Sequence, residues 1–188
     1  MPSLTNSYNA TADMTPAEEL AVAVKANDAQ QVAGVLERRP TLRSTLNDPM
    51  PGGDFGATPL LAAVARSNVE MIDVLLRAGA DINQKSHWWA GPFGVLDTAA
   101  RPDKDSGLAE WLIERGAFVD VHAASRLGRL DRLAELVAAD PGLVHARGAD
   151  GRRRCTSLPP SRSRSSCWTM ARISRRATSI TNPRLRST

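Results

Sequence analysis

Internal self-similarity is the feature that most constrains the fold of this chain. Residues 20–42 align without a gap on residues 121–143, and the turn residue Asn27 falls on Gly128. The apolar positions coincide in the two copies, Val32, Val35 and Leu36 with Leu133, Leu136 and Val137. Each copy reads as two short amphipathic helices joined by a tight turn, with no strand of any length. Such a unit, repeated along a chain, is typical of a helical solenoid.

Between these copies, residues 56–83 carry the sequence GATPLLAAVARSNVEMIDVLLRAGADIN. This segment resembles an ankyrin repeat, whose pattern is G-x-T-P-L-H-x-A-A-x-x-G-H-x-E-I-V-x-L-L-L-x-x-G-A-D-V-N. The residues that meet the pattern are Gly56, Thr58, Pro59, Leu60, Ala63, Glu70, Leu75, Leu76, Gly79, Ala80, Asp81 and Asn83. The departures are Leu61 and Asn68 in the two His positions and Ser67 in the turn Gly position.

Physical roles explain the pattern. Thr58 is expected to cap the first helix and Pro59 to open it. Ala63 is small, so that the paired helices approach closely, while Leu75 and Leu76 fill the core. Gly79 is expected to end the second helix in a left-handed conformation. The fold class expected is therefore all-α, an ankyrin-type helical repeat solenoid.

About four helix pairs are expected over residues 15–150, after a polar segment, residues 1–14, that we expect to be disordered. In the first helix, Leu20, Val22, Ala23 and Val24 are expected on one apolar face. The fourth pair begins near Val119 and carries His122 at the motif His position, where the resemblance implies a structural role in tying adjacent turns.

Charge divides the chain sharply near Gly151. Residues 151–188 contain ten Arg and no Lys, Asp or Glu, a net charge of +10. The whole chain has 24 basic and 20 acidic residues, so residues 1–150 hold 14 basic and all 20 acidic residues, a net charge of −6. Both cysteines, Cys155 and Cys167, also lie in the basic tail, which leaves the rest of the chain without a disulfide.

The basic tail is better explained as a repeat translated in the wrong reading frame than as a functional arm. A shifted reading frame joins the third base of each codon to the first two bases of the next codon. In this frame, the codons of Arg152 to Thr156 can encode T-P-L-H. Trp168 and Met170 have single codons, so the shifted frame forces Asp and Gly where a repeat of the L-L-L-D-x-G-A-D type needs them. The match is imperfect, because the helix that ends in this L-L-L-D-x-G-A-D run is three residues shorter than the corresponding helix of the intact repeat. Residues 151–188 are therefore expected to be disordered, and the fourth pair, with Leu133, Leu136 and Val137, to end the stack with an exposed apolar face open to self-association.

Two long loops hold the candidate partner-binding residues. The first, residues 47–57, carries Asp54 and Phe55. The second, residues 84–94, holds His87, Trp88, Trp89 and Phe93, and thus three of the eight aromatic residues of the chain. Trp is enriched at interface hot spots. A structural alternative stays open, in which both Trp side chains fold back on the neighbouring turn and cover a thin core.

No pattern points to catalysis, a cofactor or a metal. The chain has no Gly-rich phosphate loop and no nucleophile elbow. His87 and His145 have no Cys or His partner at metal-ligand spacing, and Cys155 and Cys167 support no site. Asp97 and Asp120 are interpreted as residues of helix starts.

The expected function follows from the resemblance. It implies a non-enzymatic protein–protein interaction module whose partner is another protein of unknown identity. The alternative is a nucleic-acid-binding protein that acts through the Arg-rich tail, with strongly salt-dependent affinity. The chain shows no secretory signal and no membrane span, so a cytoplasmic location is expected.

Overall fold

The computed structural model describes residues 14–101, 104 and 106–145. The predictions of disorder in residues 1–14 and 151–188, and the shifted reading frame, concern residues that lie outside this range, Met14 excepted. Within the described residues the chain contains four pairs of α-helices and no strand. The predicted all-α helical repeat is thereby confirmed. The chain divides into two compact units, one ending at Asp81 and one beginning at Ile82.

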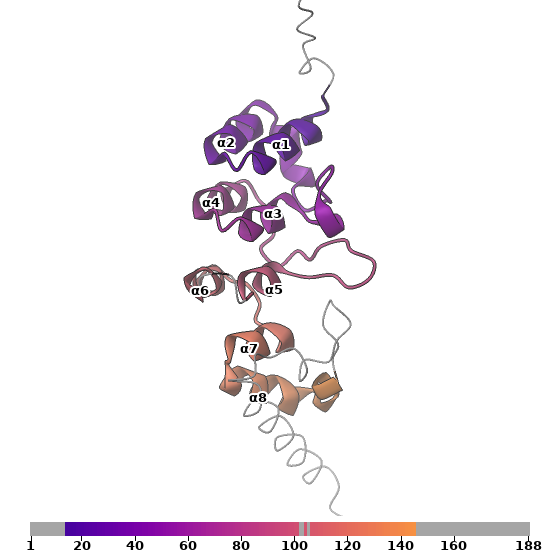
Figure 1. The fold of residues 1–188 in the computed structure, drawn as a ribbon, viewed down its shortest axis with the longest axis vertical. Coiled ribbons are helices and arrows are strands. Elements are labelled where there is room, and N and C mark those ends of the chain that lie inside the picture. Colours follow the sequence, from indigo (N-terminus) through magenta and orange to yellow (C-terminus); the bar gives the residue numbers. More distant parts are fainter. Residues whose placement is uncertain (1–13, 102–103, 105, 146–188) are drawn as a thin grey trace, which may run out of the picture. The chain divides into compact units, whose positions relative to one another are not determined.

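The first unit contains two helix pairs. Helix α1 (Pro16–Lys25) packs on α2 (Ala29–Arg38), and α3 (Pro59–Ala65) packs on α4 (Val69–Arg77). The pairs also contact each other, α1 with α3 and α2 with α4, as the upper part of Figure 1 shows. Two 3-10 helices, η1 (Pro40–Thr45) and η2 (Asp54–Gly56), lie in the connection between the pairs.

The second unit repeats this arrangement. Helix α5 (Val95–Ala99) packs on α6 (Ser106–Glu114), and α7 (Val121–Leu127) packs on α8 (Leu130–Ala139). Helix α5 also contacts α7, and α8 packs on the 3-10 helix η3 (Pro141–His145). None of the helices among the described residues combines the length and the apolar character that a membrane crossing requires.

Local signals in the sequence account for the helix starts. The Thr58 hydroxyl accepts a hydrogen bond from the Leu61 amide at 3.3 Å, and Pro59 occupies the first helical position of α3. In α1, Thr15 and Glu18 form a reciprocal capping box. Asp28 and Asn68 cap α2 and α4, and the side-chain oxygen of each accepts one hydrogen bond, from the Gln31 amide and the Met71 amide.

The core consists of small and aliphatic side chains. Leu60, Ala63 and Leu75 are buried, whereas Leu76 is half-buried. Gly79 follows α4 with a φ of 105°, a positive value that favours glycine.

Two predictions about apolar faces are wrong in part. Val22 is 49% exposed, because 100° per residue places it away from the face that Leu20 and Val24 share. Leu133 and Val137 are buried rather than exposed at the end of the stack, and Leu136 is half-buried. Leu133 and Val137 lie four residues apart on one face of α8, which packs on α7 and η3.

Candidate functional site

The segment near the start of the second unit carries the main concentration of aromatic side chains. We call residues 84–94 the aromatic loop; it precedes α5 and belongs to the second unit. It forms the long excursion beside α5 in Figure 1. This one loop therefore contains four of the predicted binding residues, His87, Trp88, Trp89 and Phe93.

Hydrogen bonds join the two arms of the aromatic loop. The Ser86 amide donates to the Phe93 carbonyl at 2.8 Å, and the Phe93 amide donates to the Ser86 hydroxyl at 3.1 Å. Ser86 itself is buried. At the tip, the Gly91 amide donates to the Trp88 carbonyl at 3.3 Å. These hydrogen bonds give the loop a defined conformation with a turn at residues 88–91, and we call this projecting structure the finger.

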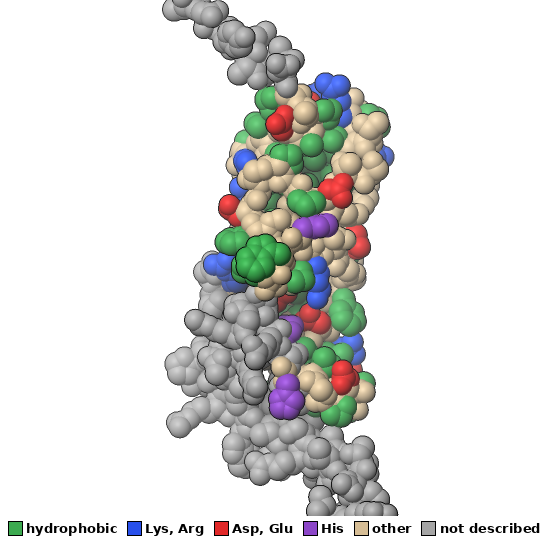
Figure 2. All heavy atoms as spheres, turned by 90° about the vertical axis from the view of Figure 1, so that its right-hand side faces the viewer, with side chains coloured by type: hydrophobic (Ala, Val, Ile, Leu, Met, Phe, Trp, Pro, Cys, Tyr) green, Lys and Arg blue, Asp and Glu red, His purple; other side chains and the backbone are tan. Residues whose placement is uncertain are grey.

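The side chains of the finger differ in exposure. The Trp89 side chain is 93% exposed and His87 is also exposed, whereas Trp88 and Phe93 are half-buried. The two tryptophans thus divide between the two interpretations that the sequence leaves open, because Trp89 covers no core and Trp88 is partly packed. Figure 2 views the molecule from the side on which the loop projects, and shows hydrophobic side chains at that surface beside His and charged side chains.

The other predicted binding residues lie in the first unit. Asp54 and Phe55 are exposed in η2, and Phe55 adopts a φ of 56°, which is uncommon for a bulky residue. They form a candidate surface of the first unit, whereas the aromatic loop belongs to the second unit. The motif residue His122 lies in α7, where it is half-buried and its amide donates to the Asp120 carboxylate at 2.9 Å.

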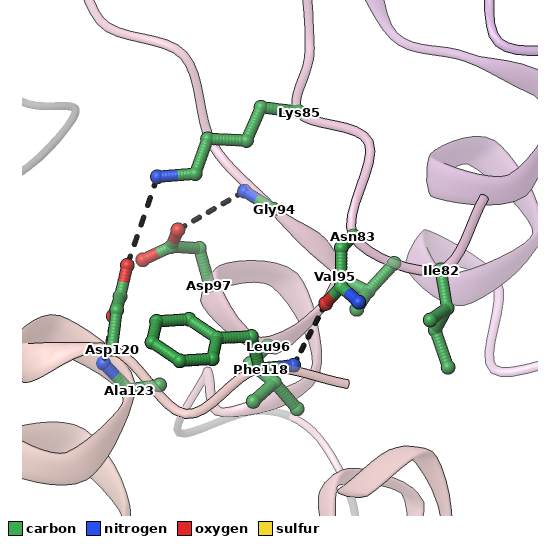
Figure 3. Close-up of a pocket in the computed structure, with 10 residues that line it drawn as sticks. All are labelled: Ile82, Asn83, Lys85, Gly94, Val95, Leu96, Asp97, Phe118, Asp120 and Ala123. Carbon is green, nitrogen blue, oxygen red and sulfur yellow. Dashed lines mark hydrogen bonds and ion pairs between the residues drawn. The ribbon is translucent and has the colours of Figure 1, made fainter. Parts of the chain in front are cut away.

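A cavity of about 340 Å³ lies within the second unit, at the base of the aromatic loop. Lys85 and Gly94, one from each arm of the loop, line it together with Asp97 of α5. Phe118 and Asp120, which precede α7, also line it. Figure 3 shows the Lys85 ammonium, both carboxylates and the Phe118 ring gathered at the same end of this cavity.

Each carboxylate of the cavity is positioned by backbone amides. One oxygen of Asp97 accepts a hydrogen bond from the Gly94 amide at 3.0 Å. One oxygen of Asp120 accepts from the amides of His122 and Ala123, and its other oxygen lies 3.8 Å from the Lys85 ammonium. Both Asp residues stand at helix starts, as predicted. Backbone contacts of this kind orient the carboxylates without neutralising their charge.

Asn83 fixes the position of Phe118. Its side-chain oxygen accepts a hydrogen bond from the Phe118 amide at 2.8 Å, and its amide nitrogen donates to the Gly116 carbonyl at 3.2 Å. The Phe118 ring is 61% exposed at the rim.

Sequence reasoning did not find this cavity, although one signal was present. The run Gly116-Ala117-Phe118 corresponds to Gly79-Ala80-Asp81 of the preceding repeat, so that an aromatic ring replaces an exposed carboxylate. The convergence of Lys85, Asp97 and Asp120 was not predictable, since it depends on the path of the aromatic loop. Among the described residues, no group of His, Cys, Asp and Glu side chains is arranged to hold a metal ion.

Comparison with known proteins agrees with the repeat architecture. The family model of the ankyrin repeat matches residues 55–87, which include α3, α4 and the first arm of the aromatic loop. No curated protein matches the chain significantly.

Proposed function

The chain is an ankyrin-repeat protein, and from this premise we propose that it is a non-enzymatic binding module whose aromatic loop anchors a protein partner. Ankyrin repeats mediate protein–protein interactions in general, which supports the class of function. The observation that carries the proposal for this loop is the exposure of Trp89, 93%, on a finger held by two hydrogen bonds between Ser86 and Phe93.

Energetics favour this role for Trp89. A tryptophan buries a large area at an interface with few rotatable bonds to restrict, so it often dominates binding free energy. The hydrogen bonds across the loop hold the finger before a partner arrives, which lowers the entropy lost on binding. The exposed indole contributes little to the stability of the free chain, so its apolar surface is available to a partner.

The test compares Trp88→Ala and Trp89→Ala in two measurements, the melting temperature and the set of proteins recovered from a lysate by quantitative mass spectrometry. We expect Trp89→Ala to leave melting unchanged and to lose partners, since truncating an anchor weakens binding by about 2 kcal/mol or more. Trp88→Ala is expected to lower the melting temperature, because its side chain is partly packed.

Leu130→Ala serves as the matched control, because Leu130 is an exposed apolar side chain of the same unit outside the loop. Partners lost in Trp89→Ala but kept in Leu130→Ala support the proposal. Unchanged partners in Trp89→Ala, or equal losses in both variants, would contradict it. Sedimentation at several concentrations separates a foreign partner from a second copy of this chain.

A further inference from the structure

We propose that the cavity at the base of the aromatic loop binds an arginine side chain of the protein partner. The inference rests on the proposed function and names the chemistry that the partner must present beside the apolar contact with Trp89. It is carried by three features of the cavity, which are a partly unpaired carboxylate, an exposed aromatic ring and a weakly held ammonium.

Charge favours a cationic ligand. Asp97 uses one carboxylate oxygen for the Gly94 amide, and no contact occupies its other oxygen among the described residues. Asp120 carries a second negative charge at the same end of the cavity, and Lys85 supplies the single positive charge. The lining residues therefore have a net charge of −1, which attracts a basic side chain of the partner. Arg126, which is outside the lining, donates a hydrogen bond to the Asp97 backbone carbonyl at 2.9 Å and not to its carboxylate.

Geometry favours a guanidinium over an ammonium. A guanidinium is planar, stacks on an aromatic face and donates two parallel hydrogen bonds to a carboxylate. The Phe118 ring and the Asp97 carboxylate offer these two surfaces within one cavity (Figure 3). Asn83 holds the Phe118 backbone amide, and the guanidinium carbon of Arg132 lies 6.0 Å from the centre of the Phe118 ring, so an incoming guanidinium shares this ring with Arg132 or displaces it.

Lys85 competes with the ligand in this arrangement. Its ammonium lies 3.8 Å from the Asp120 carboxylate, beyond hydrogen-bond distance, and its side chain is 54% exposed. An exposed pair of this kind contributes little free energy, so an incoming guanidinium displaces the ammonium toward solvent at small cost. Removal of the Lys85 charge is therefore expected to strengthen binding of a cation.

The experiment titrates the full chain with Nα-acetyl-arginine methylamide and follows the backbone amide resonances of Gly94, Phe118 and Ala123 by NMR. The neutral citrulline derivative, which has nearly the same shape, and Nα-acetyl-glutamate methylamide are the comparison probes. We expect saturable shifts with the arginine probe alone, and binding that weakens as salt is raised from 0.1 to 1 M.

Four variants sharpen the test. Asp97→Asn keeps an oxygen for the Gly94 amide but removes the charge, and is expected to weaken arginine binding at least about tenfold. Phe118→Leu removes the stacking surface and is expected to weaken it severalfold. Lys85→Gln is expected to strengthen it severalfold. Asp131→Asn, which changes an exposed carboxylate of α8 outside the cavity, is expected to leave it unchanged.

Several results would overturn the inference: equal binding of the citrulline probe, binding of the glutamate probe, or weaker arginine binding in Lys85→Gln. Unchanged binding in Asp97→Asn would also overturn it, provided that the variant keeps the wild-type melting temperature. The two proposals fail separately, because Trp89 does not line the cavity. Trp89→Ala is expected to bind the arginine probe normally even where it loses the protein partner.

Discussion

Single residues in the turns between paired helices adopt a left-handed backbone conformation. Asn27, Ser67 and Gly128 occupy these turns with φ values of 60°, 56° and 70°. Glycine adopts this left-handed conformation freely, whereas an L-residue is less stable there by about 1–2 kcal/mol. Ser67 stands where the repeat pattern has glycine, so the turn forms despite the substitution.

We expect Ser67→Gly to raise the free energy of unfolding by about 0.5–1 kcal/mol, after subtraction of the larger entropy of glycine in the unfolded chain. Gly128→Ser is the reciprocal variant and is expected to lower it by a similar amount, since a side chain there meets no other atom and only the backbone is strained. Urea denaturation of both variants checks this. A change of the same sign in both would refute the conformational explanation.

Titration of two glutamates in α1 links stability to pH. Hydrogen bonds from the Thr15 backbone and side chain lower the pKa of Glu18, and the hydrogen bond from Arg38 lowers the pKa of Glu19. A carboxyl group whose pKa is lowered on folding stabilises the fold above its ordinary pKa of 4.5. That contribution is lost as the pH falls through the lowered pKa of the folded state.

The free energy of unfolding is therefore expected to fall as the pH decreases below about 4.5, and to fall less in Glu18→Gln and Glu19→Gln. Denaturant titrations between pH 3 and 7 provide the measurement. A wild-type slope in both α1 variants would show that these glutamates do not contribute.

At the scale of the elements, asparagine side chains connect successive turns of the array. In the first unit, the Asn47 side-chain oxygen accepts a hydrogen bond from the Asp81 amide at 2.8 Å. In the second unit, Asn83 accepts from the Phe118 amide at the same distance and also donates to Gly116. The same contact thus recurs one repeat later and links the chain before each helix pair to the chain after it.

Asn83→Ala is expected to lower the free energy of unfolding by about 1–2 kcal/mol, because it leaves both backbone partners without their hydrogen bond. Asn83→Asp keeps the acceptor for the Phe118 amide but loses the donor to Gly116, so an intermediate loss is expected. Urea denaturation gives the size of each change in the free energy of unfolding, and amide exchange at Phe118 shows where the change occurs. Equal losses in the two variants would indicate that the contact with Phe118 is not the important one.

For the molecule as a whole, we propose that residues 151–188 add nothing to the packing of the repeats, because their codons can encode part of a further repeat only in a shifted reading frame. A chain that ends at Asp150 is expected to melt at the temperature of the full chain. It also loses the +10 charge of the tail and with it any retention on nucleic acid. A lower melting temperature, or slowly exchanging amides within residues 151–188, would contradict this proposal.

A chain with the reading frame restored from codon 150 provides the complementary comparison. Stability of a repeat array is approximately a sum of terms for each repeat and each interface between neighbours. An added intact repeat contributes one further interface, so the restored chain is expected to melt at a higher temperature. An equal or lower melting temperature would refute the interpretation of the tail as a displaced repeat.

Local pattern in the sequence determined the repeat architecture and most of the helix starts. Helical periodicity, the Thr58-Pro59 start and the glycine after α4 are short-range features, since caps and turns depend on residues three or four positions apart. Pattern alone could not separate the roles of Trp88 and Trp89, because adjacent residues of an irregular loop have no periodicity from which to read burial.

Tertiary structure alone decided which residues meet at the candidate site. Lys85, Asp97 and Asp120 are separated by 12 to 35 positions in the chain. They share a cavity because the hydrogen bonds between Ser86 and Phe93 bring the first arm of the aromatic loop back to the start of α5, while Asn83 holds the Phe118 amide. Exposure of Leu133 and Val137 was mispredicted for a related reason. Burial depends on the elements that pack against a face, which in α8 are α7 and η3, and a helical pattern shows the face without its neighbours.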